Sequence, residues 1–244
     1  MLLMSSVGAL IVLLLISSVP AIAAYVWFRF ARYPFSLLRF SLSLLTGAAS
    51  FFPALLMQNF FATQNGIFFS AGKWGLFADI FARIALTEEL SRLIMLILLF
   101  LIIRRITLIG QMEESLSVSA ETKPSGETMA SATGLVAGLG FALIESAVYG
   151  ASNPFNPLLR AFTAAPLHGA CGFRIGSAIA LFRTSPIRAF FRFLSAVIIH
   201  GAYNFMFFIP IPGFFPLIVA ILIAFFALFS AILAIRSGMK IPPE

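Results

Sequence analysis

The sequence predicts an all-α membrane protein, a polytopic bundle of about seven transmembrane helices. Hydrophobic residues make up 61% of its 244 residues and charged residues only 10%, and the mean hydropathy is +1.04. Soluble domains carry about 25% charged residues, so this chain has too few charges to cover a water-facing surface. Apolar runs of about 20 residues, the length that spans a bilayer, recur along the chain and predict the helices. These runs cover residues 4–28, 40–62, 76–103, 129–150, 161–182, 193–209 and 214–235.

The charges around the first run predict its orientation. The first 28 residues hold no charge, whereas Arg29, Arg32 and Arg39 follow the run. A signal peptide carries its basic residues before the apolar run, so we expect an uncleaved first helix with its N-terminus outside. With that orientation, 11 Lys and Arg fall on the cytoplasmic side and 3 on the outer side, as the positive-inside rule requires. The C-terminus is then predicted to be cytoplasmic.

The remaining composition limits the domain organisation and the partners. The net charge of +7 does not indicate a nucleic-acid partner, because the cations lie in short clusters between apolar runs. Membrane lipid is the expected surrounding. Residues 106–128, rich in Glu, Ser and Thr, are predicted to form a flexible cytoplasmic loop. No repeat or second domain is evident, so residues 1–244 are predicted to form a single transmembrane domain. The one cysteine, Cys171, is interpreted as a packing residue.

Polar side chains lie inside the third to sixth predicted helices, where an ionisable group costs about 2.5–3.5 kcal/mol and usually marks function. Counting 1.5 Å per residue, Glu88, Glu145 and His168 lie roughly 22, 24 and 21 Å from the cytoplasmic ends of their helices. In a hydrocarbon core of about 30 Å, this is a common level near the outer face, which predicts one shared site. The candidate catalytic residues are Glu88, Glu89, Glu145, His168, His200 and Asn204, with Arg92 and Tyr149 in support.

Individual members of this set also have structural explanations. Glu88 and Arg92 are four residues apart and could form a buried ion pair that lets the helix insert, although this leaves Glu89 unexplained. His200 and Asn204 could be interhelical hydrogen-bonding residues. A shared site accounts for all of them at once, so it is the preferred interpretation.

Carboxylates, imidazoles and an amide in a dry cavity suit acid–base chemistry on a carbonyl. A glutamate could take a proton from water while an imidazole and the Asn204 amide stabilise the oxyanion. No Gly-x-Ser-x-Gly motif is present, so activated water is favoured over a nucleophilic serine. Alternatively, His168, His200 and Glu145 could hold zinc with an open position for water, although the sequence has no His-Glu-x-x-His motif. A site without metal is favoured, and zinc is the alternative cofactor.

The chain resembles the PrsW family of bacterial membrane proteases over roughly residues 85–205. The motifs that carry the resemblance are Glu88-Glu89-x-x-Arg92, Phe141-x-x-x-Glu145 with Tyr149, His168, and His200-x-x-Tyr203-Asn204. That family is related to the type II CAAX prenyl proteases and, more distantly, to the Aph subunit of gamma-secretase. In this chain Arg92 stands where the family commonly has lysine, and Ser146 stands where it commonly has asparagine.

The resemblance implies a protease of the bacterial inner (plasma) membrane that cuts membrane-anchored proteins or peptides from the extracytoplasmic side. Glu88 or Glu89, together with Glu145, would activate water, and His168, His200 and Asn204 would be their partners. Members of the family have been described both as glutamic proteases and as metalloproteases. The sequence therefore predicts an intramembrane endopeptidase, with the identity of the base left open among the three glutamates. The alternatives are a proton-coupled transporter and a non-catalytic membrane scaffold.

Overall fold

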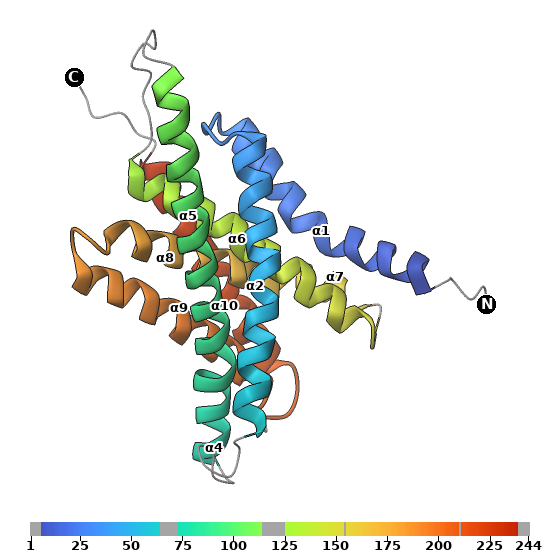
Figure 1. Cartoon of the computed structure of the whole chain (residues 1–244). Helices are drawn as coiled ribbons and strands as arrows, with labels where there is room; N and C mark the ends of the chain where they lie inside the picture. The colour runs from blue at the N-terminus through green and yellow to red at the C-terminus, as the bar shows by residue number, and fades with distance from the viewer. Residues whose placement is uncertain (1–5, 64–72, 114–124, 154, 210, 239–244) are drawn as a thin grey trace.

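A computed structural model of the chain describes residues 6–63, 73–113, 125–153, 155–209 and 211–238. All regular elements in this described part are helical, which confirms the all-α prediction. Figure 1 shows their arrangement, in which α2 and α5 lie side by side. The elements are α1 (Ser6–Phe30), α2 (Leu37–Thr63), α4 (Lys73–Ala78), the π-helix η1 (Asp79–Leu86), α5 (Thr87–Glu113), α6 (Gly126–Gly150), α7 (Asn156–Phe162), α8 (Ala164–Leu181), α9 (Pro186–Met206) and α10 (Phe215–Gly238).

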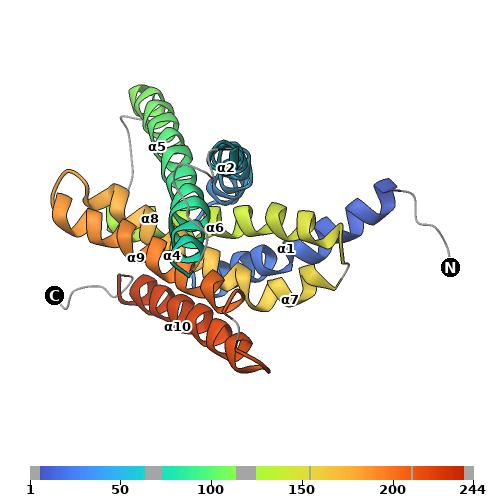
Figure 2. The same cartoon turned by 90° about the horizontal axis from the view of Figure 1, so that it is seen from below.

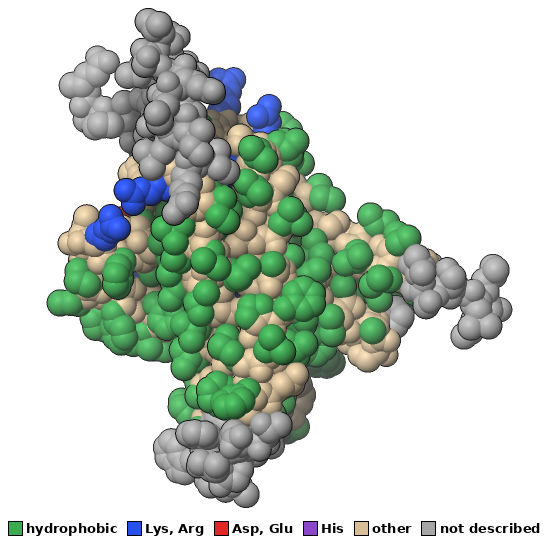
Figure 3. Space-filling model, viewed as in Figure 1, with side chains coloured by type: hydrophobic (Ala, Val, Ile, Leu, Met, Phe, Trp, Pro, Cys, Tyr) green, Lys and Arg blue, Asp and Glu red, His purple; other side chains and the backbone are tan. Residues whose placement is uncertain are grey.

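Five helices in the described part of the chain are long and apolar enough to cross a membrane. They span Gly8–Phe30, Leu37–Ala62, Gly126–Gly150, Pro186–Met206 and Phe215–Gly238. The two other predicted spans contain α5 and α8, whose ionisable residues lower their hydropathy, so the count of seven spans stays a prediction. The orientation of the termini also stays a prediction. Hydrophobic side chains cover most of the face seen in Figure 3, with Lys and Arg toward its upper part. Together with the five apolar helices, this surface identifies the chain as an integral membrane protein.

The predicted cytoplasmic loop at 106–128 is shorter than its sequence indicated. Helix α5 continues to Glu113, because residues such as Leu, Gln and Met at this end of α5 favour helix. Helix α6 begins at Gly126, where the Ser125 hydroxyl caps it by accepting a hydrogen bond from the Thr128 backbone N–H at 3.2 Å. The prediction of a loop was therefore wrong at both ends, and residues 114–124 lie outside the described residues.

The fifth predicted run, 161–182, corresponds to α8, but its first two residues belong to the end of the short helix α7. Thr163, with φ −121° and ψ −70°, interrupts the helical backbone between α7 and α8. Pro166 then lies in the first turn of α8. Backbone N–H groups in a first turn have no partner within the helix, so the missing N–H of proline costs no helical hydrogen bond there. The break lets α7 run in a different direction from α8, as Figure 2 shows.

Helix α6 lies at the centre of the bundle and packs against α1, α2 and α8. In an apolar stretch of 18 residues within α6, 78% of the residues are buried, compared with 17% in such a stretch of α1. The approach of α8 to α6 depends on glycine. A Cβ added at Gly138 would lie 1.9 Å from the His168 carbonyl oxygen, so only glycine allows this backbone contact. Small residues at such crossings are typical of membrane helix packing.

We expect Gly138→Ala to destabilise the protein by about 1–3 kcal/mol, the usual cost of overpacking a well-packed core. The added methyl group collides with backbone atoms of α8 rather than with a mobile side chain. The thermal unfolding midpoint in detergent measures the effect. Gly126→Ala is the matched control, because no atom lies within 4 Å of a Cβ added there. Equal midpoints for the two variants would show that the α6–α8 contact is not tight.

Candidate active site

The N-terminal end of α5 presents Glu88 and Glu89 to the interior of the bundle. The π-helix η1 leads directly into this end, and π-helical turns often occur at functional sites. Phe81 of η1 lies against α9, where a Cβ added at Gly201 would be 2.3 Å from the Phe81 ring. This contact places the beginning of α5 beside the turn of α9 that carries His200.

Glu89, Arg92 and His200 form a buried chain of contacts. Arg92 is fully buried and its Nη1 forms an ion pair with Glu89 Oε2. The other Glu89 oxygen lies 2.8 Å from His200 Nδ1. An ionised carboxylate only accepts hydrogen bonds, so His200 donates from Nδ1. In the neutral imidazole, Nε2 then carries a lone pair. The pairing also corrects one expectation, since the partner of Arg92 is Glu89 rather than Glu88.

A second chain of contacts fixes His168. Its Nε2 lies 2.8 Å from Glu145 Oε2, and its Nδ1 lies 3.2 Å from Arg92 Nη2. A guanidinium has no acceptor, so His168 Nδ1 accepts the hydrogen bond from Arg92 and Nε2 donates to Glu145. Arg160 of α7 donates to the same Glu145 oxygen at 2.5 Å and to Ser146 Oγ at 3.2 Å. Helix α6 carries no Lys or Arg, and Arg160 of α7 provides the positive charge that pairs with Glu145.

Glu88 differs from Glu89 and Glu145 in forming no hydrogen bond or ion pair with an arginine among the described residues. Its Oε1 accepts a hydrogen bond of 2.9 Å from Gln58 Nε2 of α2. Its Oε2 is buried and finds no hydrogen-bond partner among the described residues. His200 Nε2 lies 3.5 Å from this oxygen. Buried polar atoms are nearly always paired, so this oxygen is a candidate for a functional role.

The two imidazole rings meet between these chains of contacts. The ring centroids of His168 and His200 are 4.9 Å apart and nearly perpendicular, at 85°. One ligand atom each from Glu88, His168 and His200 lies within 4.8 Å of the other two. The sequence had suggested Glu145 as the carboxylate of a metal set. In the structure, Glu88 joins the two histidines in the group, while Glu145 is held by Arg160 and His168.

The remaining predicted residues lie at the border of the cluster. Asn204 is one helical turn beyond His200 and partly buried, and in the described part of the chain it has no side-chain hydrogen bond to the other five candidates. Tyr149 is half-exposed, and its ring centroid lies 4.4 Å below the Arg160 guanidinium carbon. The Arg92 guanidinium lies 4.7 Å from the ring centroid of Phe141, an arrangement that favours a buried cation.

Neither Gln58 nor Arg160 is among the site residues that the sequence predicts. Gln58 is a polar residue near the end of the apolar run 40–62, and its position within that run could have indicated a role in the site. Arg160 is one of the 3 cations that the predicted topology places on the outer side, and the sequence did not show that α7 packs against α6. Both residues now have a defined partner in the cluster.

The fold and this cluster define a polytopic membrane protein with ionisable groups buried inside its helix bundle. The model of a protein family described as PrsW family intramembrane metalloproteases matches residues 34–232. The chain belongs to this family, and membership indicates an intramembrane protease. No curated protein and no solved structure matches the chain.

The description of the family implies a metal ion, and the residues present fit one. Two imidazoles and a carboxylate with an open position form a ligand set found in catalytic zinc sites. Glu89 holds His200 through its other ring nitrogen, as carboxylates commonly do for metal-binding histidines. The unpartnered Glu88 oxygen supplies an anionic donor in the same group.

Proposed function

We propose that this chain is an intramembrane endopeptidase in which Glu88 activates the attacking water. One observation carries this proposal: the buried Glu88 Oε2 has no hydrogen-bond partner among the described residues and lies beside His200. A buried carboxylate with one oxygen that forms no hydrogen bond to the protein is suited to take a proton from a bound water molecule. Glu89 and Glu145 suit that role less, because each already binds an arginine and a histidine.

In the proposed reaction, Glu88 Oε2 takes a proton from water as the water oxygen attacks the carbonyl carbon of the scissile peptide bond. The C–N bond then breaks, and the proton passes to the leaving nitrogen. The Asn204 amide would donate to the developing oxyanion. His200, held by Glu89 through Nδ1, presents the lone pair of Nε2 beside Glu88. Glu145 and Arg160 position His168. Arg92 contacts both Glu89 and His168, and so connects the pair of Glu89 and His200 to the pair of Glu145 and His168.

A metal ion would be held by Glu88, His168 and His200. To bind it through Nε2, His168 would give up its hydrogen bond to Glu145 and carry its proton on Nδ1, so the hydrogen bond from Arg92 would be lost as well. When bound, zinc would supply a Lewis acid that polarises the carbonyl and lowers the pKa of water. The charges of the cluster are compatible with an added cation. Glu88, Glu89 and Glu145 carry three negative charges, and Arg92 and Arg160 carry two positive charges.

The substrate class follows from the burial of the site. The catalytic groups lie inside a bundle whose surface is largely apolar, so a substrate must reach them within or along the bilayer. We propose a membrane-anchored protein or peptide of the bacterial inner membrane, cleaved in the outer half of the bilayer. The positive-inside distribution of Lys and Arg supports that location.

The metal content of the purified protein, measured together with cleavage of a model single-span peptide, tests this proposal. Stoichiometric zinc with chelator-sensitive cleavage would assign Glu88, His168 and His200 as ligands. Metal-free cleavage that is lost in Glu88→Gln would assign a glutamic protease. Solute uptake into liposomes without peptide cleavage would overturn the proposal in favour of a transporter, because buried carboxylates and histidines also relay protons.

A further inference from the structure

A cavity separate from the candidate active site lies between α5, the end of α8 and the beginning of α9. Its volume is about 630 Å³, within the range of about 300–1,000 Å³ that ligand pockets occupy. None of the six candidate catalytic residues lines it. Its lining includes Leu93, Arg104, Ala180, Arg183, Phe190 and Phe193.

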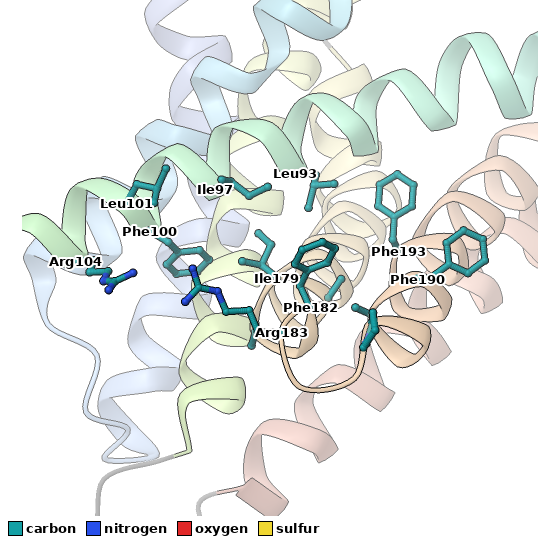
Figure 4. A pocket seen from close by; sticks show the side chains of 14 residues that line it. Leu93, Ile97, Phe100, Leu101, Arg104, Ile179, Phe182, Arg183, Phe190 and Phe193 are labelled. Carbon is teal, nitrogen blue, oxygen red and sulfur yellow. The ribbon is translucent and has the colours of Figure 1, made fainter.

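The cavity has a polar end and an apolar end. Arg104 of α5 and Arg183, which follows α8, lie near one another at one end, whereas Phe190 and Phe193 lie at the other (Figure 4). The lining includes two cations, and no acidic residue is among the described residues that form it. An anion is therefore the group that this end would attract.

A cavity with two cations at one end and apolar walls at the other matches the chemistry of a phospholipid. Guanidinium groups bind phosphate oxygens in a planar, often bidentate arrangement. The apolar walls beyond the arginines suit an acyl chain, since burying its methylene groups away from water is favourable. Both arginines belong to segments predicted on the cytoplasmic side, where anionic headgroups attract basic residues.

We propose that this cavity binds one anionic phospholipid, with its phosphate between Arg104 and Arg183 and an acyl chain along α5 and α9. The bound lipid connects α5, which carries Glu88 and Glu89, to the turn between α8 and α9. Its headgroup contacts the two arginines, and its chain fills the space beside Leu93 and Phe193.

Native mass spectrometry of the delipidated protein in detergent tests the proposal by titration with phosphatidylglycerol and with phosphatidylcholine of the same chains. We expect tighter binding of phosphatidylglycerol by the wild type. Arg104→Ala combined with Arg183→Ala should weaken that binding about thirtyfold, from the contribution of two basic residues at a membrane surface. Arg188→Ala is the matched control, because Arg188 is exposed on α9 and does not line the cavity.

A steric variant and a competitor distinguish a lipid from a free anion. Ala180→Phe keeps both arginines and fills part of the apolar lining, so it should also weaken phosphatidylglycerol binding. Inorganic phosphate in excess should not displace the lipid. The proposal is overturned if the double arginine variant binds phosphatidylglycerol like the wild type, if Arg188→Ala weakens binding equally, or if inorganic phosphate displaces the lipid.

Discussion

Glu88→Gln is expected to lower the rate of peptide cleavage about 10²–10⁴-fold, the contribution of a positioned general base, while the protein stays folded. Glutamine keeps an oxygen that can accept the hydrogen bond from Gln58, but its amide nitrogen cannot take a proton from water. The measurement is the initial rate of cleavage of a single-span peptide by the reconstituted protein.

Glu127→Gln is the matched control for this variant. Glu127 lies at the beginning of α6 and accepts a hydrogen bond of 2.8 Å from Ser177, and glutamine retains an acceptor for it. We expect near wild-type cleavage in this control. Equal rates in Glu88→Gln and the wild type would remove Glu88 from the proposed reaction, whereas equal losses in both variants would indicate a general effect of removing a carboxylate.

Arg92→Met is expected to destabilise the folded protein by about 3–5 kcal/mol, the cost of leaving one partner of a buried ion pair without its counter-charge. Arg92 is fully buried, and its removal takes the counter-charge from Glu89, which keeps its contact with His200. It also removes the donor to His168 Nδ1. Methionine retains much of the aliphatic volume, so the loss reports the charge rather than a cavity. Unfolding in mixed micelles measures the difference.

Two further variants separate the ion pair from packing. Arg83→Met removes the cation of the Asp79–Arg83 pair, whose side chains are 29% and 24% exposed, and partly exposed pairs contribute about 0–1 kcal/mol. Glu89→Gln added to Arg92→Met removes the unpaired charge and should recover part of the stability. If Arg92→Met is as stable as Arg83→Met, the buried pair does not hold the cluster together.

The composition and the spacing of polar residues were enough to predict the helical class and to gather the candidate residues. Each helix rises 1.5 Å per residue, so a count from the end of an apolar run gives a depth. The depths of Glu88, Glu145 and His168 agreed, and the structure brings these three side chains into one connected cluster with Glu89, Arg92 and His200. Their chemical roles stay predictions.

The pairing inside the cluster could not be predicted, because it depends on the angles and distances at which helices cross. Spacing along one helix favoured Glu88 as the partner of Arg92, since four residues separate them. In the structure, α9 instead brings His200 into contact with one oxygen of Glu89, and Arg92 forms its ion pair with the other oxygen of that carboxylate. The same limitation applies to Gln58, which meets Glu88 only because α2 packs against α5.

The most direct test of the proposed function is cleavage of a single-span peptide by the purified, reconstituted protein in ¹⁸O-labelled water with hydroxylamine present. Attack by activated water predicts one cleavage within the span, with ¹⁸O in the new C-terminal carboxylate and no hydroxamate product. An intact peptide in the presence of folded protein would contradict the account. A hydroxamate product would also contradict it, because it would show an acyl-enzyme formed by a side-chain nucleophile.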